Sequence, residues 1–299
     1  MLEGIWTPKE YASHAWELWL PSIAITDIDG VYGAIEFYSA CKKNDIKPII
    51  GTTLSYVPNN QLKQKNEDLQ QVTFLAKTDK GYHNLLELIS LASLWAWHER
   101  SRFDLGILTE FHDEMFLIFG GEYSPIMSMI KHKKDQKTIV AFLKTFEEHI
   151  PRECCLLWLL TQDESDIYVY AHNEMIRNLA KEMAWTVILL TEVKYITSTD
   201  QDLFDVWLAV KDGKRVFDDD RRMTTWSHHL MTYEEISTVM LKNWYAQSEI
   251  ENRCVQTNDV ANCCNVEIAL WGILFPKYEN PSHISSLYEE YKDKLVTKI

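Results

Sequence analysis

The chain places few metal-binding or catalytic side chains where a hydrolytic reaction would need them. In α/β proteins built on parallel strands, the reacting groups lie where the strands end. The residues that follow the short apolar runs of this sequence are Asp27, Ile28, Thr52, Thr53, Gly120, Gly121, Thr161, Gln162, Thr191, Glu192 and Lys194. A hydrolytic metal centre needs several His, Asp and Glu ligands that converge on one or more cations. Only Asp27 and Glu192 are carboxylates here and no histidine is present, so we expect a site that is poor in ligands.

The chain has 10 histidines, and they lie away from these strand ends. Several fall within helical patterns or at their ends among surface-type residues, which predicts solvated or locally hydrogen-bonded rings for His14, His83, His98, His149 and His172. His228 and His229 form the one adjacent pair, but neighbouring residues of an extended segment point to opposite sides. The pair is therefore a weak candidate for metal binding.

Two further motifs do not fit known catalytic patterns. The run Gly120-Gly121-Glu122 lacks the lysine and the glycine spacing of a phosphate-binding loop. The acidic and basic run at 218–222 (DDDRR) has neither the spacing of a calcium loop nor that of a polymerase carboxylate site, and we interpret it as a hydrated turn.

Composition narrows the class of protein. The formal net charge of −14 argues against a direct grip on nucleic acid, because such a surface repels phosphate unless basic side chains are segregated from the acids. No 18-residue apolar run occurs and the N-terminus lacks the apolar core of a secretory signal, so we expect a cytoplasmic protein with no membrane contact. The 6 cysteines contain no CxxC pair, which predicts reduced, mostly buried thiols.

Short apolar strands alternate with helical patterns along most of the chain. We predict strands at 22–26, 47–54, 72–76, 115–119, 154–160 and 186–190. Helices are expected from Pro8, with Thr7 as the N-cap, and at 33–43, 81–97, 139–148, 164–183, 200–210 and 246–261. The β-α-β order of the first 55 residues predicts parallel strands. Periodicity alone leaves a barrel and a doubly wound sheet open.

One stretch identifies a family. Residues 21–57, PSIAITDIDGVYGAIEFYSACKKNDIKPIIGTTLSYV, resemble the early PHP region of the alpha subunits of bacterial DNA polymerase III, the C-family replicative polymerases. Weaker likeness continues in the same order at 74–77, 81–85, 206–219, 233–236, 258–267 and 276–278. The resemblance implies a PHP-type distorted (β/α)7 TIM-like barrel over residues 1–270. It further implies that 271–299 form a linker and a first helix, at 283–299, toward the polymerase palm. The family's opening His-x-His strand would precede Met1, so that strand is expected to be missing or dispensed with.

The departures from the family pattern fall on its metal ligands. Where metal-competent members have a histidine after the counterpart of Asp27, this chain has Ile28, and Thr53 replaces an acid. Gln71 and Gln162 match two further histidines, and Glu192 with Lys194 match the closing Asp-x-His pair. A lysine ammonium has three donors and no acceptor, so it cannot bind a cation. It can pair with Asp27 or Glu192, or point to solvent.

These departures predict a degenerate metal pocket with no catalytic residue, no cofactor and no metal in this segment; Mg²⁺ would serve only the parent DNA-directed DNA polymerase. The vestigial pocket positions are Asp27, Ile28, Thr53, Gln71, Gln162, Glu192 and Lys194. The domain would then act as a structural and subunit-interaction module. Its expected partners are the rest of the polymerase chain and a proofreading exonuclease subunit, with DNA bound only through the parent protein.

Two alternatives stay open at this point. A metal-dependent 3′–5′ exonuclease or phosphoesterase would need other ligands, with His112, His228 and His229 as the spare candidates. The error-prone branch of the same polymerase family shares the fold, and its Asp-Gly-x-Tyr-Gly turn is similar to residues 29–33 of this chain.

Overall fold

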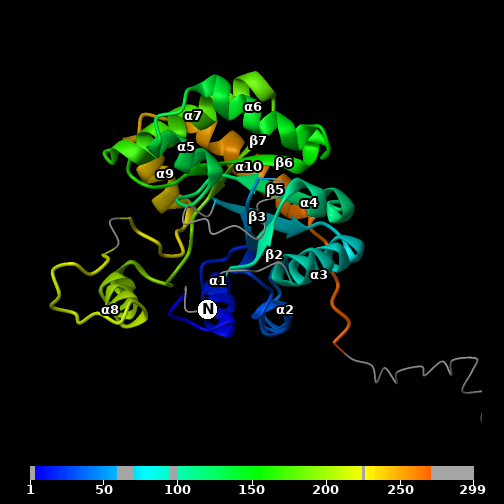
Figure 1. The fold of residues 1–299 in the computed structure, drawn as a ribbon. Helices are drawn as coiled ribbons and strands as arrows, with labels where there is room; N and C mark the ends of the chain where they lie inside the picture. Colours follow the sequence, from blue (N-terminus) through cyan, green and yellow to red (C-terminus); the bar gives the residue numbers. More distant parts are fainter. Residues whose placement is uncertain (1–3, 59–69, 95–99, 224–225, 271–299) are drawn as a thin grey trace, which may run out of the picture. The chain divides into compact units, whose positions relative to one another are not determined.

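Figure 1 shows the computed structural model, which describes residues 4–58, 70–94, 100–223 and 226–270. The chain divides into two compact units, Met1–Ile268 and Ala269–Ile299. The helix predicted for 283–299 and the end of the one predicted for 81–97 lie outside the described residues, and the domain boundary at residue 270 stays a prediction. None of the described helices is long and apolar enough to span a lipid bilayer.

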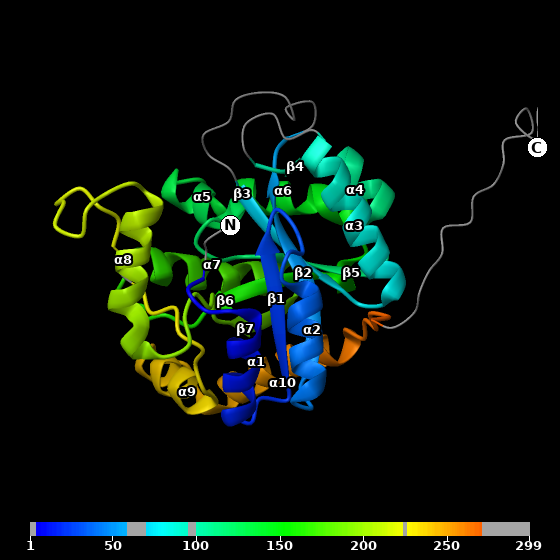
Figure 2. The same ribbon diagram turned by 90° about the horizontal axis from the view of Figure 1, so that it is seen from below.

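The first unit is built on one mixed, strongly curled seven-stranded sheet (Figures 1 and 2). Its path runs through β1 (Ser22–Ile28), β2 (Lys47–Tyr56), β3 (Gln70–Ala76), β5 (Met115–Phe119), β6 (Cys155–Leu160) and β7 (Thr186–Leu190), and β4 (Arg102–Phe103) pairs with β2. Apart from β4, the strands therefore lie side by side in the order in which they occur along the chain. The curled sheet forms a half-barrel, which confirms the predicted class of distorted α/β barrel.

The direction of the strands is only partly as predicted. β1 pairs in parallel with β2, and β5, β6 and β7 are also parallel. β3, in contrast, runs antiparallel to both β2 and β5. A parallel return needs a crossover, usually a helix, over the face of the sheet, and the polar sequence between β2 and β3 has no helical pattern. The reversal brings the first residues of β3 to the rim where β1 and β2 end.

The helices lie outside the curled sheet, as Figures 1 and 2 show. They are α1 (Pro8–Glu17), α2 (Ala34–Lys43), α3 (Asp79–Leu94), α4 (Leu105–Phe111), α5 (Pro125–Lys131), α6 (Gln136–Glu147), α7 (Ile167–Met183), α8 (Gln201–Lys211), α9 (Tyr233–Lys242) and α10 (Gln247–Cys263), with 3₁₀ turns at Arg152–Cys154 and Ser198–Asp200. Thr7 is the N-cap of α1, as predicted, and it forms a reciprocal capping box with Glu10. The helical pattern did not predict α4, α5 or α9. α4 and α5 have only seven residues each and show too few repeats of the helical period.

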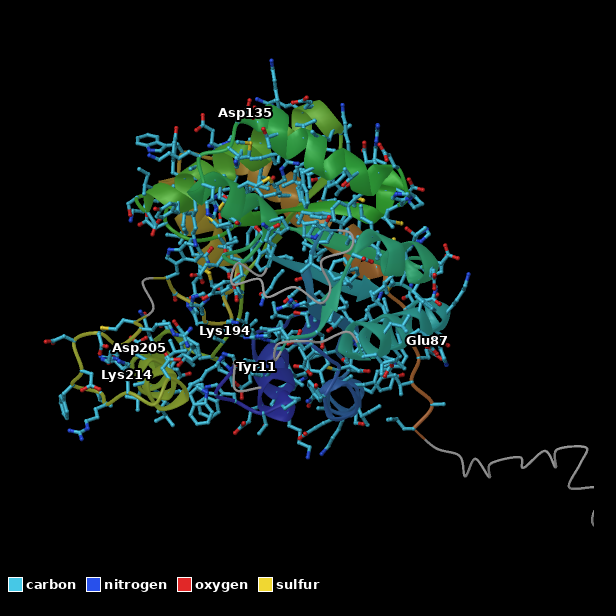
Figure 3. All side chains as sticks on the ribbon, in the orientation of Figure 1. Tyr11, Glu87, Asp135, Lys194, Asp205 and Lys214 are labelled. Carbon is cyan, nitrogen blue, oxygen red and sulfur yellow. The ribbon has the colours of Figure 1, made fainter. Side chains whose placement is uncertain are left out.

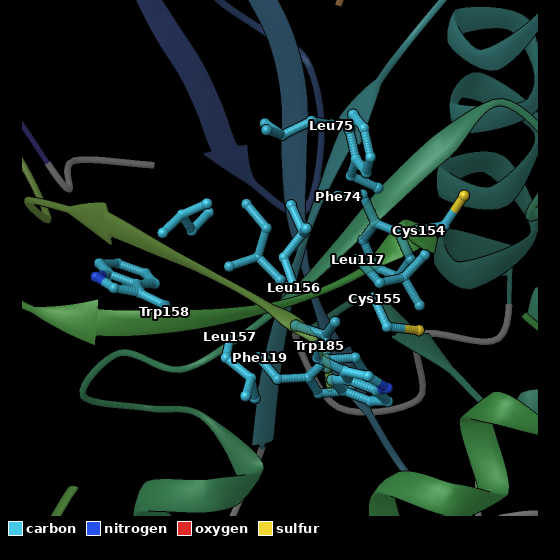
Figure 4. Close-up of a cluster of buried hydrophobic side chains, with 14 of the residues drawn as sticks. Phe74, Leu75, Leu117, Phe119, Cys154, Cys155, Leu156, Leu157, Trp158 and Trp185 are labelled. Carbon is cyan, nitrogen blue, oxygen red and sulfur yellow. The ribbon is translucent and has the colours of Figure 1, made fainter. Parts of the chain in front are cut away.

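The core lies where the middle strands meet the covering helices. Every residue of β5 and β6 is buried, which fits their unbroken apolar sequences and their central place in the sheet. Figure 4 shows this cluster, in which Phe119 of β5 lies 5.5 Å, ring to ring, from Trp185. Phe146 of α6 packs against the same Phe119 ring at 4.9 Å in an edge-on arrangement. This packing holds the middle strands of the sheet in place, and the site lies at the ends of the sheet's strands.

Candidate functional site

A pocket of about 500 Å³ lies at the rim of the curled sheet. The ends of β1, β2 and β7, the reversed start of β3 and the turn after β5 supply most of its wall, and α1 closes one side. The predicted positions that line it are Asp27, Ile28, Thr53, Gln71, Glu192 and Lys194. Gln71 reaches this rim only because β3 runs against its neighbours.

Gln162 is the predicted position that does not line the pocket. Its backbone carbonyl accepts a hydrogen bond from the Asn243 side chain at 2.8 Å, which ties the end of β6 to the C-cap of α9. The side chain itself is buried, and its Oε1 atom has no hydrogen-bond partner. The end of β6 is therefore committed to packing beside α9.

The polar side chains at the ends of β1 and β2 are held by local hydrogen bonds. The Asp27 carboxylate accepts a bond from the backbone N–H of Gly33 at 2.7 Å, at the N-cap of α2. The Thr53 hydroxyl lies 2.9 Å from that of Thr73 on β3. One hydroxyl pair and the Asp27 carboxylate therefore link neighbouring segments around the pocket.

An ion pair lies inside the pocket. The Lys194 ammonium lies 2.8 Å from the Glu192 carboxylate, and about a fifth or less of each side chain is exposed, at 14% and 21%. Burial alone would raise the pKa of Glu192, but the charge of Lys194 and its hydrogen bond outweigh this and hold that pKa below its usual value. Of the arrangements that the sequence left open for Lys194, the structure has the pair with Glu192.

Two pocket side chains were missed by the sequence analysis. Burial, followed by repulsion from Glu192, raises the pKa of Glu122, which follows the glycine pair after β5. The hydroxyl of Tyr11 on α1 is buried without a hydrogen-bond partner, and burial raises its pKa. Figure 3 shows Tyr11 and Lys194 on the same side of the unit. A carboxylate just past a strand end was the available signal for Glu122.

The turn after β5 packs tightly against Trp158 of β6. Gly120 and Gly121 both have positive φ, at 148° and 92°. A Cβ atom on Gly120 would lie 2.5 Å from the Trp158 Cβ, and one on Gly121 would lie 2.9 Å from its indole ring. Glycine is therefore needed at both positions, for conformation and for space.

Comparison with known proteins identifies the family. Residues 1–156, more than half of the chain, match the PHP domain. The chain belongs to the PHP domain family. The DNA polymerase III subunit alpha of Escherichia coli strain K12 is 26% identical over 282 residues, which covers 93% of this chain and 23% of that protein. The corresponding subunit of Buchnera aphidicola is 24% identical over 282 residues, with the same coverage of 93% and 23%.

A third relative is similar over a shorter stretch. The DNA polymerase III subunit alpha of Chlamydia trachomatis serovar D is 35% identical over 114 residues, 37% of this chain and 9% of that protein. The chain thus spans about a quarter of the length of the first two relatives, at 23%. The predicted resemblance to the N-terminal region of these subunits is confirmed.

Among the residues that the structure describes, no histidine of this PHP domain lines the pocket. His228 is buried, with Nδ1 2.9 Å from the Glu192 carbonyl oxygen, and His229 Nε2 lies 3.2 Å from a Glu235 carboxylate oxygen. The Nδ1 atom of His112 lies 3.0 Å from the Thr109 carbonyl oxygen at the end of α4. The three spare ligands are thus engaged locally.

Of the two arrangements predicted for His172, a solvated ring or a locally hydrogen-bonded one, the structure has the second. This residue of α7 is fully buried, with Nδ1 3.4 Å from the Asn173 side-chain oxygen. Its Nε2 atom is buried without a partner, and burial lowers the pKa of the ring to about 4. His98 lies outside the described residues, while His14, His83 and His149 are partly or fully exposed.

Within the described part of the chain, no three His, Cys, Asp or Glu side chains come together in a way that could hold a metal ion. In the rim pocket the carboxylates are Asp27, Glu122 and Glu192, and the last is paired with Lys194. An ammonium 2.8 Å from a carboxylate competes for the oxygen that a cation would use, and it repels that cation. These donors do not fit the ligand set of a hydrolytic metal centre.

Proposed function

We propose that this PHP domain is a metal-free structural and subunit-interaction module of a replicative DNA polymerase III alpha subunit. The observation that carries the proposal is the Lys194–Glu192 ion pair, at 2.8 Å inside the pocket. The pair satisfies a buried carboxylate from within the chain, so the pocket needs no cation for its charge balance at that point.

The remaining degenerate positions support the same proposal. Ile28 is apolar, and Thr53 and Gln71 are neutral, so none of them replaces the anionic or imidazole ligands that the family resemblance leads one to expect. Hard divalent cations favour carboxylate oxygens, and neutral hydroxyl or amide groups alone hold them weakly. The pocket is then a degenerate metal site, and the residues of its wall serve to pack the end of the barrel.

The context of the domain comes from its relatives. They are polymerase subunits about four times as long as the matched region, since that region covers 23% of each. We infer a cytoplasmic role in DNA replication, in which Mg²⁺ and DNA are bound elsewhere in the parent protein. The remainder of the polymerase chain and a proofreading exonuclease subunit are the proposed partners, and the formal charge of −14 fits a domain that does not grip DNA itself.

Metal analysis of the purified protein tests the proposal. We expect well under one equivalent of Mn, Fe or Zn per chain, and no heat of binding when Mn²⁺ or Zn²⁺ is titrated. We also expect no chelator-sensitive release of nucleotides from single-stranded DNA and no hydrolysis of a phosphate monoester. Near-stoichiometric metal, with nuclease activity that a chelator abolishes, would instead support the alternative of a 3′–5′ exonuclease or phosphoesterase.

A variant that restores the family ligands provides the positive control. The combined substitutions Ile28→His, Thr53→Glu, Gln71→His and Lys194→His return the side chains implied by the family pattern to positions that line one pocket. We expect this variant to bind Mn²⁺ or Zn²⁺ where the parent domain does not. Tight binding by the parent and variant alike would contradict the proposal.

A further inference from the structure

A second pocket, of about 430 Å³, lies between the C-terminal half of α7 and the side of α10. Both helices pack on β7, and Figure 1 shows them in the same part of the unit. The polar side chains of its wall are Arg177, Lys181, Thr186, Glu249, Arg253 and Gln256. None of these residues lines the rim pocket, so this is a separate site with a different charge.

The guanidinium group of Arg253 is fixed but has donors to spare. One terminal nitrogen donates to the Gln256 side-chain oxygen at 3.0 Å. The other lies 3.7 Å from a Glu249 carboxylate oxygen, which is an ion pair but too long for a hydrogen bond. The Nε atom is buried and has no hydrogen-bond partner. Arginine carries five N–H donors, so this group is short of acceptors.

Arg177 is oriented by an aromatic ring. Its guanidinium carbon lies 4.9 Å from the centre of the Tyr245 ring, close enough for a cation–π contact. Such a contact orients the planar group without using its N–H donors as a carboxylate would. The pocket therefore contains a second guanidinium whose hydrogen-bonding edge is not consumed by that contact.

The pocket has a net positive charge, whereas the chain as a whole is negatively charged. Arg177, Lys181 and Arg253 outnumber Glu249 here, whereas the whole chain has a formal charge of −14. Basic residues at a helix C-terminus can simply complement the helix dipole. That explains Lys181, which lies in the last turn of α7, but not Arg177, which lies further from that end, nor Arg253 within α10.

We propose that this pocket binds a phosphate-type oxyanion, either free phosphate or the phosphate group of a small ester such as a nucleotide. Two guanidinium groups and an ammonium match a dianion, and planar guanidinium groups bind phosphate oxygens in pairs. A pocket of about 430 Å³ has room beyond the phosphate, since a liquid water molecule takes only about 30 Å³. The carbonyl end of α7 opposes an anion, so we expect a modest affinity.

Titration of the full chain with inorganic phosphate, pyrophosphate and AMP, followed by calorimetry and amide NMR in low-chloride buffer, tests this site. We expect saturable binding with shifts confined to α7 and α10, and at least a ten-fold loss of affinity in Arg253→Gln, or in Arg177→Gln should the first variant unfold (~1.4 kcal/mol per factor of ten). Arg253→Lys should lose most of the affinity as well, because it keeps the charge but not the planar fork.

The control is Arg215→Gln, which removes the same charge from an exposed loop outside both pockets. Binding that this control weakens as much as Arg253→Gln would overturn the site, because the attraction would then be general. No phosphate binding, or binding only of a polyglutamate peptide, would overturn it too. If AMP binds more tightly than free phosphate, the ligand is the ester; the reverse order identifies the free anion. Neither result depends on whether the rim pocket holds a metal.

Discussion

Acidification should weaken this domain through one imidazole, that of His172. The ring is fully buried on α7, and burial lowers its pKa from 6.5 to about 4. The unfolded chain therefore takes up a proton near pH 6.5 while the folded protein resists protonation until about pH 4. The contribution of the neutral ring to the free energy of unfolding is fully present above about pH 6.5. It falls as the pH drops from about 6.5 to about 4, and below about pH 4 it does not change further.

The size of the effect follows from the pKa values. The full shift corresponds to about 3 kcal/mol at roughly 1.4 kcal/mol per pKa unit. By about pH 5 most unfolded molecules but few folded ones carry the proton, so about 2 kcal/mol should be lost relative to about pH 7.5. That is a large part of the roughly 5–15 kcal/mol typical of a folded domain.

Urea unfolding at several pH values between about 7.5 and about 5 measures this loss. Comparison with His172→Gln isolates the imidazole, because the amide fills similar space and does not titrate. We expect the free energy of unfolding to fall less with acid in His172→Gln than in the parent, by about 2 kcal/mol. The exposed His149→Gln is the matched control and should retain the parent's pH dependence. Identical slopes for the parent and His172→Gln would refute the reasoning.

Three other substitutions test the packing of the unit by urea unfolding at neutral pH. Gly51→Ala should cost about 2 kcal/mol or more, because its Cβ would lie 2.1 Å from the Phe74 carbonyl oxygen across β2 and β3; an unchanged midpoint would contradict that contact. Thr232→Ala removes the capping box of α9 and should cost about 1 kcal/mol, with Thr232→Ser restoring most of it. Lys194→Met leaves Glu192 buried without its partner and should cost about 2 kcal/mol at neutral pH; a stabilised variant would mean that the pair is not needed.

The strands were predictable because their chemistry is local. The runs 115–119 and 186–190 match β5 and β7 at both ends, since each is an apolar segment between turn residues. Helix starts were harder to predict. The helix expected from residue 164 begins at Ile167, because the Asp166 side chain caps the N–H groups of Tyr168 and Val169.

A periodic signal for His172 was present in the sequence. It lies on the same face of α7 as Val169, Ile176, Leu179 and Met183, which are all buried. Spacing of three and four residues predicts one buried stripe, and a histidine within that stripe is carried into the core by its neighbours. The prediction left a solvated and a locally hydrogen-bonded ring open for His172, and this stripe would have chosen the buried, hydrogen-bonded one.

The periodicity of the sequence could not predict which residues come together in the rim pocket. Gln71 lies beside Thr53 and Glu192 in one pocket because β3 is reversed, and no local propensity of its sequence encodes that direction. The family resemblance identified the vestigial pocket positions from matching motifs alone, without any knowledge of how the strands are arranged. It did not reveal Glu122, which has no counterpart in the quoted motifs, or the packing of Gln162 beside α9.

The glycine pair after β5 limits how this pocket can change. Because the indole of Trp158 occupies the space that a side chain at 120 or 121 would need, neither position can acquire a nucleophile or a ligand by a single substitution. New chemistry must therefore arise elsewhere on the pocket wall, which includes β1, β2, β3, α1, residues 122–124 and the segment after β7. Directed evolution of this scaffold would gain most from libraries restricted to those segments, with 120 and 121 left untouched.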